Sequence, residues 1–161
     1  MSELETTFNK LVSDYSERLY WHIRAIVEDH DEADDILQNV FMKAWQALPS
    51  FRGDCTYFTW LWRIATNESL LALRKIRFKG LFVGLENAFG VSGSDFNGNK
   101  AETELQKAIM TLPPKQKSVF CMRYYEELSY EEISEITDTS VGALKASYHF
   151  AYEKVKKYLT D

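Results

Sequence analysis

Residues 51–79 have the sequence FRGDCTYFTWLWRIATNESLLALRKIRFK, in which an aromatic segment is followed by a basic one. Five of the first twelve residues are aromatic, and the last seventeen hold five bases and one acid. The spacing of the apolar residues predicts a helix over 56–75 with two different faces. One face is apolar and is expected to lie in a core; it consists of Phe58, Leu61, Ala65 and Ala72.

The opposite face of this helix has a composition typical of nucleic-acid binding. It carries Trp60, Arg63, Asn67 and Arg74, at offsets of 0, 3, 7 and 14 residues. An exposed aromatic ring stacks on unpaired bases, arginine binds phosphate, and an amide hydrogen-bonds a base edge. Aromatic residues at helical spacing usually belong to a core, so a core helix with a solvated polar side is an equal alternative on this pattern alone.

The composition indicates a globular protein with one domain or two small ones. Of the 161 residues 45% are hydrophobic, which is enough for packed cores, and no stretch is apolar over the length needed to cross a membrane. The N-terminus has no basic and apolar segments of a signal peptide, so we expect a cytoplasmic protein. Cys55 and Cys121 form no CxxC pair, and the three histidines have no ligand spacing. We therefore expect neither a metal nor a cofactor.

The charge is unevenly distributed along the chain. The net charge is −5, which by itself argues weakly against a nucleic-acid binder. Residues 28–35, EDHDEADD, contain six acids and no lysine or arginine, whereas 63–79 and 145–157 are basic. One acidic and two basic segments together are less typical of an evenly solvated surface than any one of them alone.

Two further helices are predicted before residue 50. Apolar residues at helical spacing indicate one over 4–27 and another that begins near Asp31, which we expect to be its N-cap, and ends at Pro49. The outward side of the second helix carries polar residues that we regard as a candidate protein interface: Asp35, Gln38 and Asn39.

Residues 80–101 predict a flexible linker, because five of the seven glycines of the chain fall there. The linker divides the chain into an N-terminal domain, 1–79, and a C-terminal domain, 102–161. Neither part shows strand alternation. The expected fold class is therefore all-α, with two small helical domains.

The C-terminal domain contains a predicted helix-turn-helix. Ser129 and Glu132 form a capping box, a polar turn follows at 137–139, and Ser140 is placed to cap a second helix. The stripe expected to be buried on that helix is Val141, Leu144, Tyr148, Ala151, Val155 and Leu159. The small residues on its free face would let it approach the major groove. An ordinary αα-hairpin is the structural alternative.

These three segments together resemble bacterial RNA polymerase sigma factors of the extracytoplasmic-function (ECF) class. EADDILQNVFMKAW is similar to their polymerase-binding helix, and FRGDCTYFTWLWRIATN to the loop and helix that open the −10 promoter element. The stretch that begins LPPKQKSVF and runs through 159 is similar to their −35-binding domain. The resemblance covers nearly the whole chain outside the linker and implies a region 2-like and a region 4-like domain.

The resemblance also implies a role for individual residues. Core polymerase would contact Asp35, Gln38 and Asn39, although the family often has glutamate at the last position. The −10 strand would contact Trp60, Arg63, Asn67 and Arg74, with Asn67 holding a flipped base. The −35 duplex would contact Lys145, Ala146, His149 and Phe150. Several arginines common in this recognition helix are missing, so the isolated protein should bind phosphate weakly.

We therefore expect a transcription initiation factor, without enzymatic activity, that binds core RNA polymerase and promoter DNA. It would read −35 as duplex and −10 as melted strand. The resemblance further implies a membrane-linked anti-sigma factor as a partner, and no small-molecule substrate is expected. A stand-alone helix-turn-helix repressor or activator, with an N-terminal dimerisation or sensing domain, is the main alternative. A small helical enzyme acting on nucleic acid is another, but no nucleophile–base pair or carboxylate constellation supports it.

Overall fold

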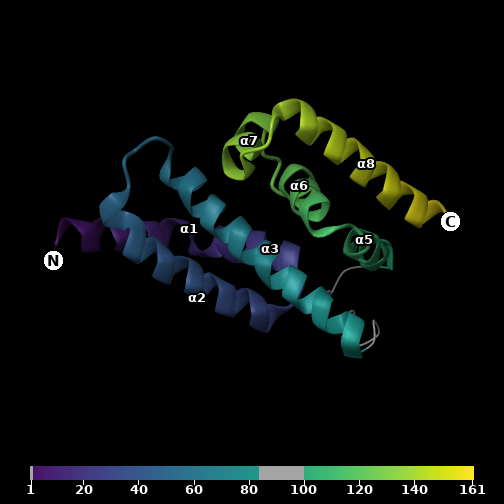
Figure 1. Cartoon of the computed structure of the whole chain (residues 1–161), viewed down its shortest axis with the longest axis horizontal. Helices are drawn as coiled ribbons and strands as arrows, with labels where there is room; N and C mark the ends of the chain where they lie inside the picture. The colour runs from purple at the N-terminus through teal and green to yellow at the C-terminus, as the bar shows by residue number, and fades with distance from the viewer. Residues whose placement is uncertain (1, 84–99) are drawn as a thin grey trace.

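The computed structural model describes residues 2–83 and 100–161, and both parts are helical (Figure 1). The first part contains α1 (Glu3–Val27), α2 (His30–Ala47), the 3-10 turn η1 (Leu48–Ser50) and α3 (Tyr57–Val83). The second part contains α5 (Lys100–Met110), α6 (Pro114–Tyr124), α7 (Tyr130–Thr137) and α8 (Val141–Thr160). No strand occurs in these two described parts, which confirms the all-α prediction. Most of the predicted linker, 84–99, lies outside the described residues.

The turn between α1 and α2 begins the second helix earlier than the sequence suggested. Glu28 ends α1 in the left-handed region, with φ of 69°. Asp29 then has extended backbone, and its carboxylate accepts a hydrogen bond from the Glu32 amide at 2.9 Å. The prediction of Asp31 as the N-cap was therefore wrong by two residues. The chain reverses at Glu28, so Asp29 is the first residue with the backbone conformation that a cap requires.

The N-terminal core is centred on the buried side of α3. Leu61 and Ala65 are fully buried, as predicted, while Phe58 and Ala72 are partly buried against the same core. The largest side chain in this core is Trp62, which the pattern did not single out. Its ring stacks on Phe58, with 4.1 Å between the ring centroids.

The two halves of the chain pack against each other along α3. Figure 1 shows α3 lying between α2 on one side and α6 and α7 on the other, and contacts join α3 to both of these C-terminal helices. At the centre of the contact stands Glu126, just after α6. Its carboxylate accepts a hydrogen bond from the Trp62 indole at 2.9 Å and lies 2.5 Å from Nδ1 of His22. Nε2 of His22 is in turn 2.8 Å from the Thr66 hydroxyl.

Two more polar contacts join the halves. We call the whole contact surface between residues 2–83 and 100–161 the seam. Lys117 of α6 is completely buried and pairs with Glu28 at the end of α1. Burial lowers the pKa of Lys117 to about 7. The Arg77 guanidinium donates to the carbonyl oxygens of Met110 and Leu112, at 2.9 and 2.7 Å, and burial lowers its pKa as well. The described halves therefore form one packed unit.

The electrostatics of Glu126 give the seam a pH dependence. Burial alone would raise the pKa of this carboxyl. The charge and hydrogen bond of His22, the hydrogen bond from Trp62 and the charge of Arg18 act in the opposite direction. The net result is a pKa below its ordinary value of 4.5. The folded protein therefore favours the ionised carboxylate.

We expect Glu126→Ala to lower the free energy of unfolding by about 1–3 kcal/mol, because two buried donors lose their acceptor. Since folding lowers the pKa of Glu126, its contribution is complete above the ordinary pKa and is lost as the pH falls through the lowered value. Chemical denaturation near neutral pH and again well below pH 4.5 measures this difference.

The neighbouring Glu127 provides a matched control, because it is exposed and has a left-handed φ of 55° that alanine would keep. Glu127→Ala should change the free energy of unfolding by less than about 0.5 kcal/mol. Equal losses in the two variants, or a loss in Glu126→Ala that is undiminished at low pH, would contradict this account of the seam.

Candidate nucleic-acid interface

The polar face of α3 is only partly open to solvent in this structure. Asn67 and Arg74 are exposed, whereas Trp60 and Arg63 are half-buried. The Trp60 ring lies beside Phe51 and Tyr57, with centroids 5.2 and 6.3 Å away. Trp60 therefore belongs to an aromatic cluster at the start of the helix, and its ring is not free on all sides.

The Arg63 side chain links α3 to the C-terminal half. Its Nε donates to the backbone carbonyl of Glu135 in α7 at 2.6 Å, and its Nη1 lies 3.6 Å from the Cys55 sulfur. The structure thus brings the four predicted residues onto one side of α3, but part of that side faces α7. The guanidinium of Arg63 has a protein partner in this conformation.

Local sequence explains how the loop before α3 positions this face. The Thr56 hydroxyl accepts a hydrogen bond from the Thr59 amide at 3.1 Å, as an N-cap does. Gly53 has φ of 79°, a conformation that favours glycine. Phe51 and Tyr57 stack across the loop, with centroids 4.5 Å apart. The sequence shows these aromatic residues, but their spacing did not predict that they lie beside Trp60.

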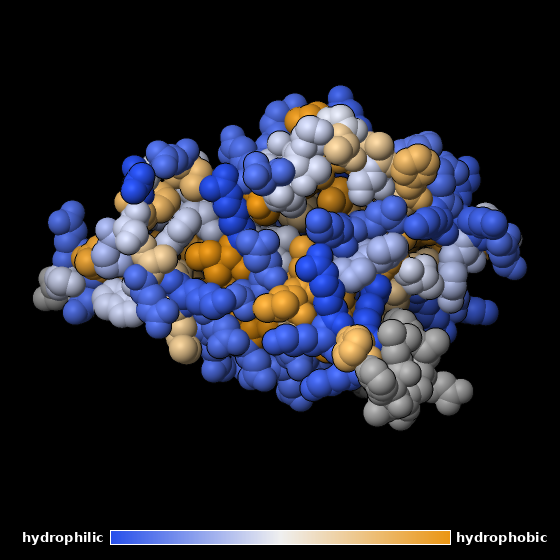
Figure 2. All heavy atoms as spheres, in the orientation of Figure 1, coloured by the Kyte–Doolittle hydropathy of each residue, from blue (hydrophilic) through white to orange (hydrophobic). Residues whose placement is uncertain are grey.

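The outward side of α2 forms one wall of a groove. Asp35, Gln38 and Asn39 are all exposed, as predicted. Asp35 and Asn39 line a groove of about 330 Å³ whose opposite wall, on α3, includes Leu71 and Lys75. Leu71 is 48% exposed although it is apolar. Figure 2 shows apolar atoms gathered in the middle of this view, where α2 and α3 run in Figure 1, within a largely hydrophilic surface.

This groove combines an acidic wall on α2 with a wall on α3 that carries apolar residues, two lysines and Glu68, and such a mixture suits a protein partner. The α3 residues of the groove were missed by the sequence analysis. A signal was present, because Leu71, Lys75 and Lys79 follow one another at intervals of four and so share one side of the helix. The prediction for α3 instead used the face that carries Trp60, because the aromatic segment lies before these residues.

The helix-turn-helix is confirmed at the level of its caps. Ser129 and Glu132 form the capping box of α7, Asp138 turns the chain with φ of 55°, and the Ser140 hydroxyl accepts from the Ala143 amide at 3.2 Å. The four predicted contact residues on α8 are all exposed: Lys145, Ala146, His149 and Phe150. This face is open even though the two halves are packed together.

The predicted buried stripe of α8 ends one turn early. Leu144, Ala151 and Val155 are buried, but Leu159 is 47% exposed. Its side chain lines a pocket that Leu105 of α5 and Phe120 of α6 also line. The prediction of a buried Leu159 was therefore wrong, because α5 and α6 leave this pocket open beside it.

Residues 2–83 and 100–161 show neither a metal site nor a membrane span. They contain no group of three or more histidine, cysteine, aspartate or glutamate side chains arranged to hold a metal ion. None of the helices in these ranges combines the length and the apolar character that crossing a membrane requires.

Comparison with known proteins gives consistent matches over both halves. The family models for Sigma-70 region 2 and for Sigma-70, region 4 match residues 11–78 and 102–155. The RNA polymerase sigma-H factor of Pseudomonas aeruginosa is 32% identical, over 94% of this chain and 86% of that protein. The ECF RNA polymerase sigma factor SigW of Bacillus subtilis is 30% identical, over 98% of this chain and 91% of that protein.

Solved structures agree on the fold. The sigma factor RpoE from Bartonella quintana, in complex with the anti-sigma factor NepR, superimposes with a TM-score of 0.71 at 22% identity, over 96% of this chain and 97% of that one. CnrH, in complex with the cytosolic domain of CnrY, superimposes with a TM-score of 0.72 at 22% identity, over 97% of this chain and 89% of that one. The two matched Sigma-70 regions and the two relatives that are at least 30% identical establish that the chain belongs to the ECF class of the sigma-70 family of RNA polymerase sigma factors.

Proposed function

We propose that this sigma factor directs core RNA polymerase to promoters by reading −35 as duplex and −10 as unpaired strand. The observation that carries the proposal is the free face of α8, where four predicted contact residues are exposed on a capped second helix of a helix-turn-helix. The alternative of a stand-alone repressor has no support from the N-terminal half, which matches Sigma-70 region 2.

The chemistry of α8 suits contact with base edges in the major groove. Gly142, Ala143 and Ala146 are small and exposed, so the backbone of the helix can come close to the bases. Lys145 and His149 supply polar groups on the same exposed side, and Phe150 offers an apolar surface for thymine methyl groups.

The chemistry of α3 suits an unpaired strand. Asn67 offers an amide donor and acceptor at an exposed position, and Arg74 offers a cation further along the helix. Trp60 adds an aromatic surface beside them. Use of Arg63 on DNA requires that its bond to the Glu135 carbonyl be broken, so we infer that α7 moves away from α3 when the −10 strand binds.

We expect Asn67→Ala to leave binding to core polymerase and to −35 duplex nearly unchanged while reducing open-complex formation. Flipping a base costs a few kcal/mol, and hydrogen bonds from the Asn67 amide offset part of this free energy. We therefore expect open-complex formation to fall by about tenfold or more. Permanganate reactivity of thymines in the −10 region measures strand opening, and a promoter with a pre-melted −10 bubble should recover part of the loss. Normal reactivity in both Asn67→Ala and Trp60→Ala would mean that this face is only a solvated side of α3.

The groove between α2 and α3 is the proposed polymerase-binding surface. Asp35→Lys combined with Gln38→Ala should weaken binding to core polymerase by about 5–30-fold, because the charge of Asp35 is reversed and a neighbouring exposed amide is removed. The helical content measured by circular dichroism should not change. Asp14→Lys with Ser13→Ala makes the same change of charge at exposed positions of α1 and serves as the control. Equal affinity of the two double variants for the polymerase would exclude this groove as the interface.

We also propose an anti-sigma factor as a partner, linked to the membrane. The support is that the superimposable RpoE was solved in complex with the anti-sigma factor NepR, and CnrH in complex with the cytosolic domain of CnrY. Purification of the tagged chain from its native cells should recover both polymerase and a second, smaller binding protein from the membrane fraction. Recovery of polymerase alone under every growth condition tested would refute this proposal.

A further inference from the structure

One side of α8 has a regular order of residue types along its length. Ala143, Ala146, Phe150, Lys154 and Lys157 follow one another at steps of 3, 4, 4 and 3, so they form one stripe on the helix. All five are exposed. The stripe begins with small residues in the half of the helix proposed to read −35, continues through an aromatic ring and ends in two lysines.

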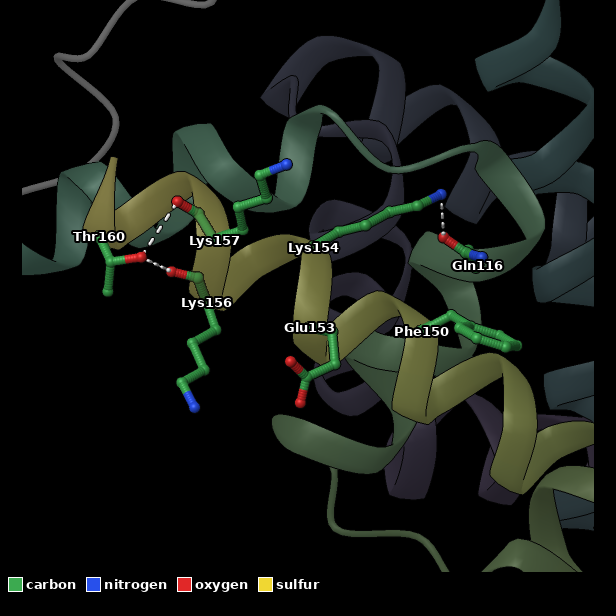
Figure 3. Close-up of a pocket in the computed structure, with 7 residues that line it drawn as sticks. All are labelled: Gln116, Phe150, Glu153, Lys154, Lys156, Lys157 and Thr160. Carbon is green, nitrogen blue, oxygen red and sulfur yellow. Dashed lines mark hydrogen bonds between the residues drawn. The ribbon is translucent and has the colours of Figure 1, made fainter.

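The two lysines lie beside a shallow pocket between α8 and the start of α6. Figure 3 shows the side chains of Lys154 and Lys157 extending to one side of α8, with Phe150 next along the helix and Glu153 directed to the other side. The Lys154 ammonium donates to the Gln116 side-chain oxygen of α6 at 3.1 Å. The pocket has a volume of about 560 Å³, and Glu153 is the one acid among its lining residues.

The first part of α8, residues 141–153, has few cations for binding DNA phosphates; we call this part the recognition half. Contacts to phosphate supply most of the affinity of a protein for DNA, yet Lys145 is the one lysine between residues 141 and 153 and no arginine occurs there. The whole chain carries a net charge of −5. A duplex held by the first half of α8 alone would therefore gain little from its phosphates.

The length of α8 places the lysines where phosphates should lie. At 1.5 Å per residue, Lys154 and Lys157 lie about 12 and 16 Å beyond Ala146 along the helix axis. The major groove is about 12 Å wide. If Ala146 is at the bases, the helix therefore leaves the groove at these lysines and meets the sugar–phosphate backbone there.

We propose that Lys154 and Lys157 bind the phosphates that border the −35 major groove and supply the affinity that the recognition half lacks. Phe150, proposed above to meet thymine methyl groups, lies between Ala146 and these lysines on the same stripe. Gln116 holds the Lys154 ammonium in place and offers its own amide N–H groups to the same backbone. The inference rests on the proposed −35 function of α8 and assigns to its second half a contact that does not depend on base sequence.

The test uses the full chain assembled with core polymerase, and a promoter fragment with intact or altered −35 bases. Lys154→Ala with Lys157→Ala should make the slope of log K against log salt less steep by about 1.8, or about 0.9 for each lost phosphate. The fold-loss should be the same on intact and altered −35 sequences. Lys145→Ala, by contrast, should change the ratio between those two sequences.

The matched control is Lys100→Ala with Lys107→Ala, which removes two exposed charges from α5, outside the stripe. It should leave the salt slope within about 0.3 of the unaltered protein, since no phosphate contact is lost. An equal change in both double variants, or an unchanged slope in Lys154→Ala with Lys157→Ala, would overturn the inference. So would a loss of transcription with unchanged DNA affinity, because the lysines would then meet an acidic protein surface. Failure of the unaltered protein to distinguish intact from altered −35 bases would instead refute the proposed function of α8.

Discussion

The carboxylate of Glu126 is the contact on which the arrangement of the two halves depends. It accepts the Trp62 indole hydrogen bond from α3 and stands against the His22 ring of α1, so three segments meet at one group. The buried pair of Lys117 and Glu28 extends the same seam. A hydrogen bond of this kind contributes a net stabilisation of only about 1 kcal/mol, because water replaces it when the partners separate. These polar contacts are set in apolar packing, because buried residues of both halves belong to one hydrophobic cluster, among them Leu61 and Met122.

The seam also determines which surfaces are open at the same time. The acidic wall of α2 and the recognition face of α8 both point away from it and are exposed. Arg63 lies at its edge and donates to the backbone of α7. Under the proposed function, the packed form presents the polymerase groove and the −35 face while part of the −10 face is engaged within the chain. A polymerase that separates the halves would make the −10 face available after it has bound.

Features that depend on near neighbours in the chain were predictable from the sequence. The capping box at Ser129 and the exposed residues of α8 follow from spacings of three and four residues, and both were found as expected. The seam was not predictable, because His22 and Glu126 are separated by 104 positions. Glu126 has the appearance of one more acidic residue in a polar segment. Trp62 was counted only among the aromatic residues of 51–62 and was assigned to neither face of the helix, whereas contacts from both halves bury it completely. The −10, −35 and polymerase contacts themselves remain predictions.

The environment of Trp62 has an optical consequence. The chain has four tryptophans; Trp21 and Trp45 are 61% and 43% exposed, and Trp60 is half-buried. Trp62 is the one that is fully enclosed, with its indole N–H bound to a carboxylate that belongs to the other half. Separation of the halves would remove that carboxylate and admit water to the indole, which shifts the emission of tryptophan to longer wavelength. The protein thus contains an intrinsic fluorophore at the contact between its halves. The emission wavelength of Trp62 reports whether the halves are packed together.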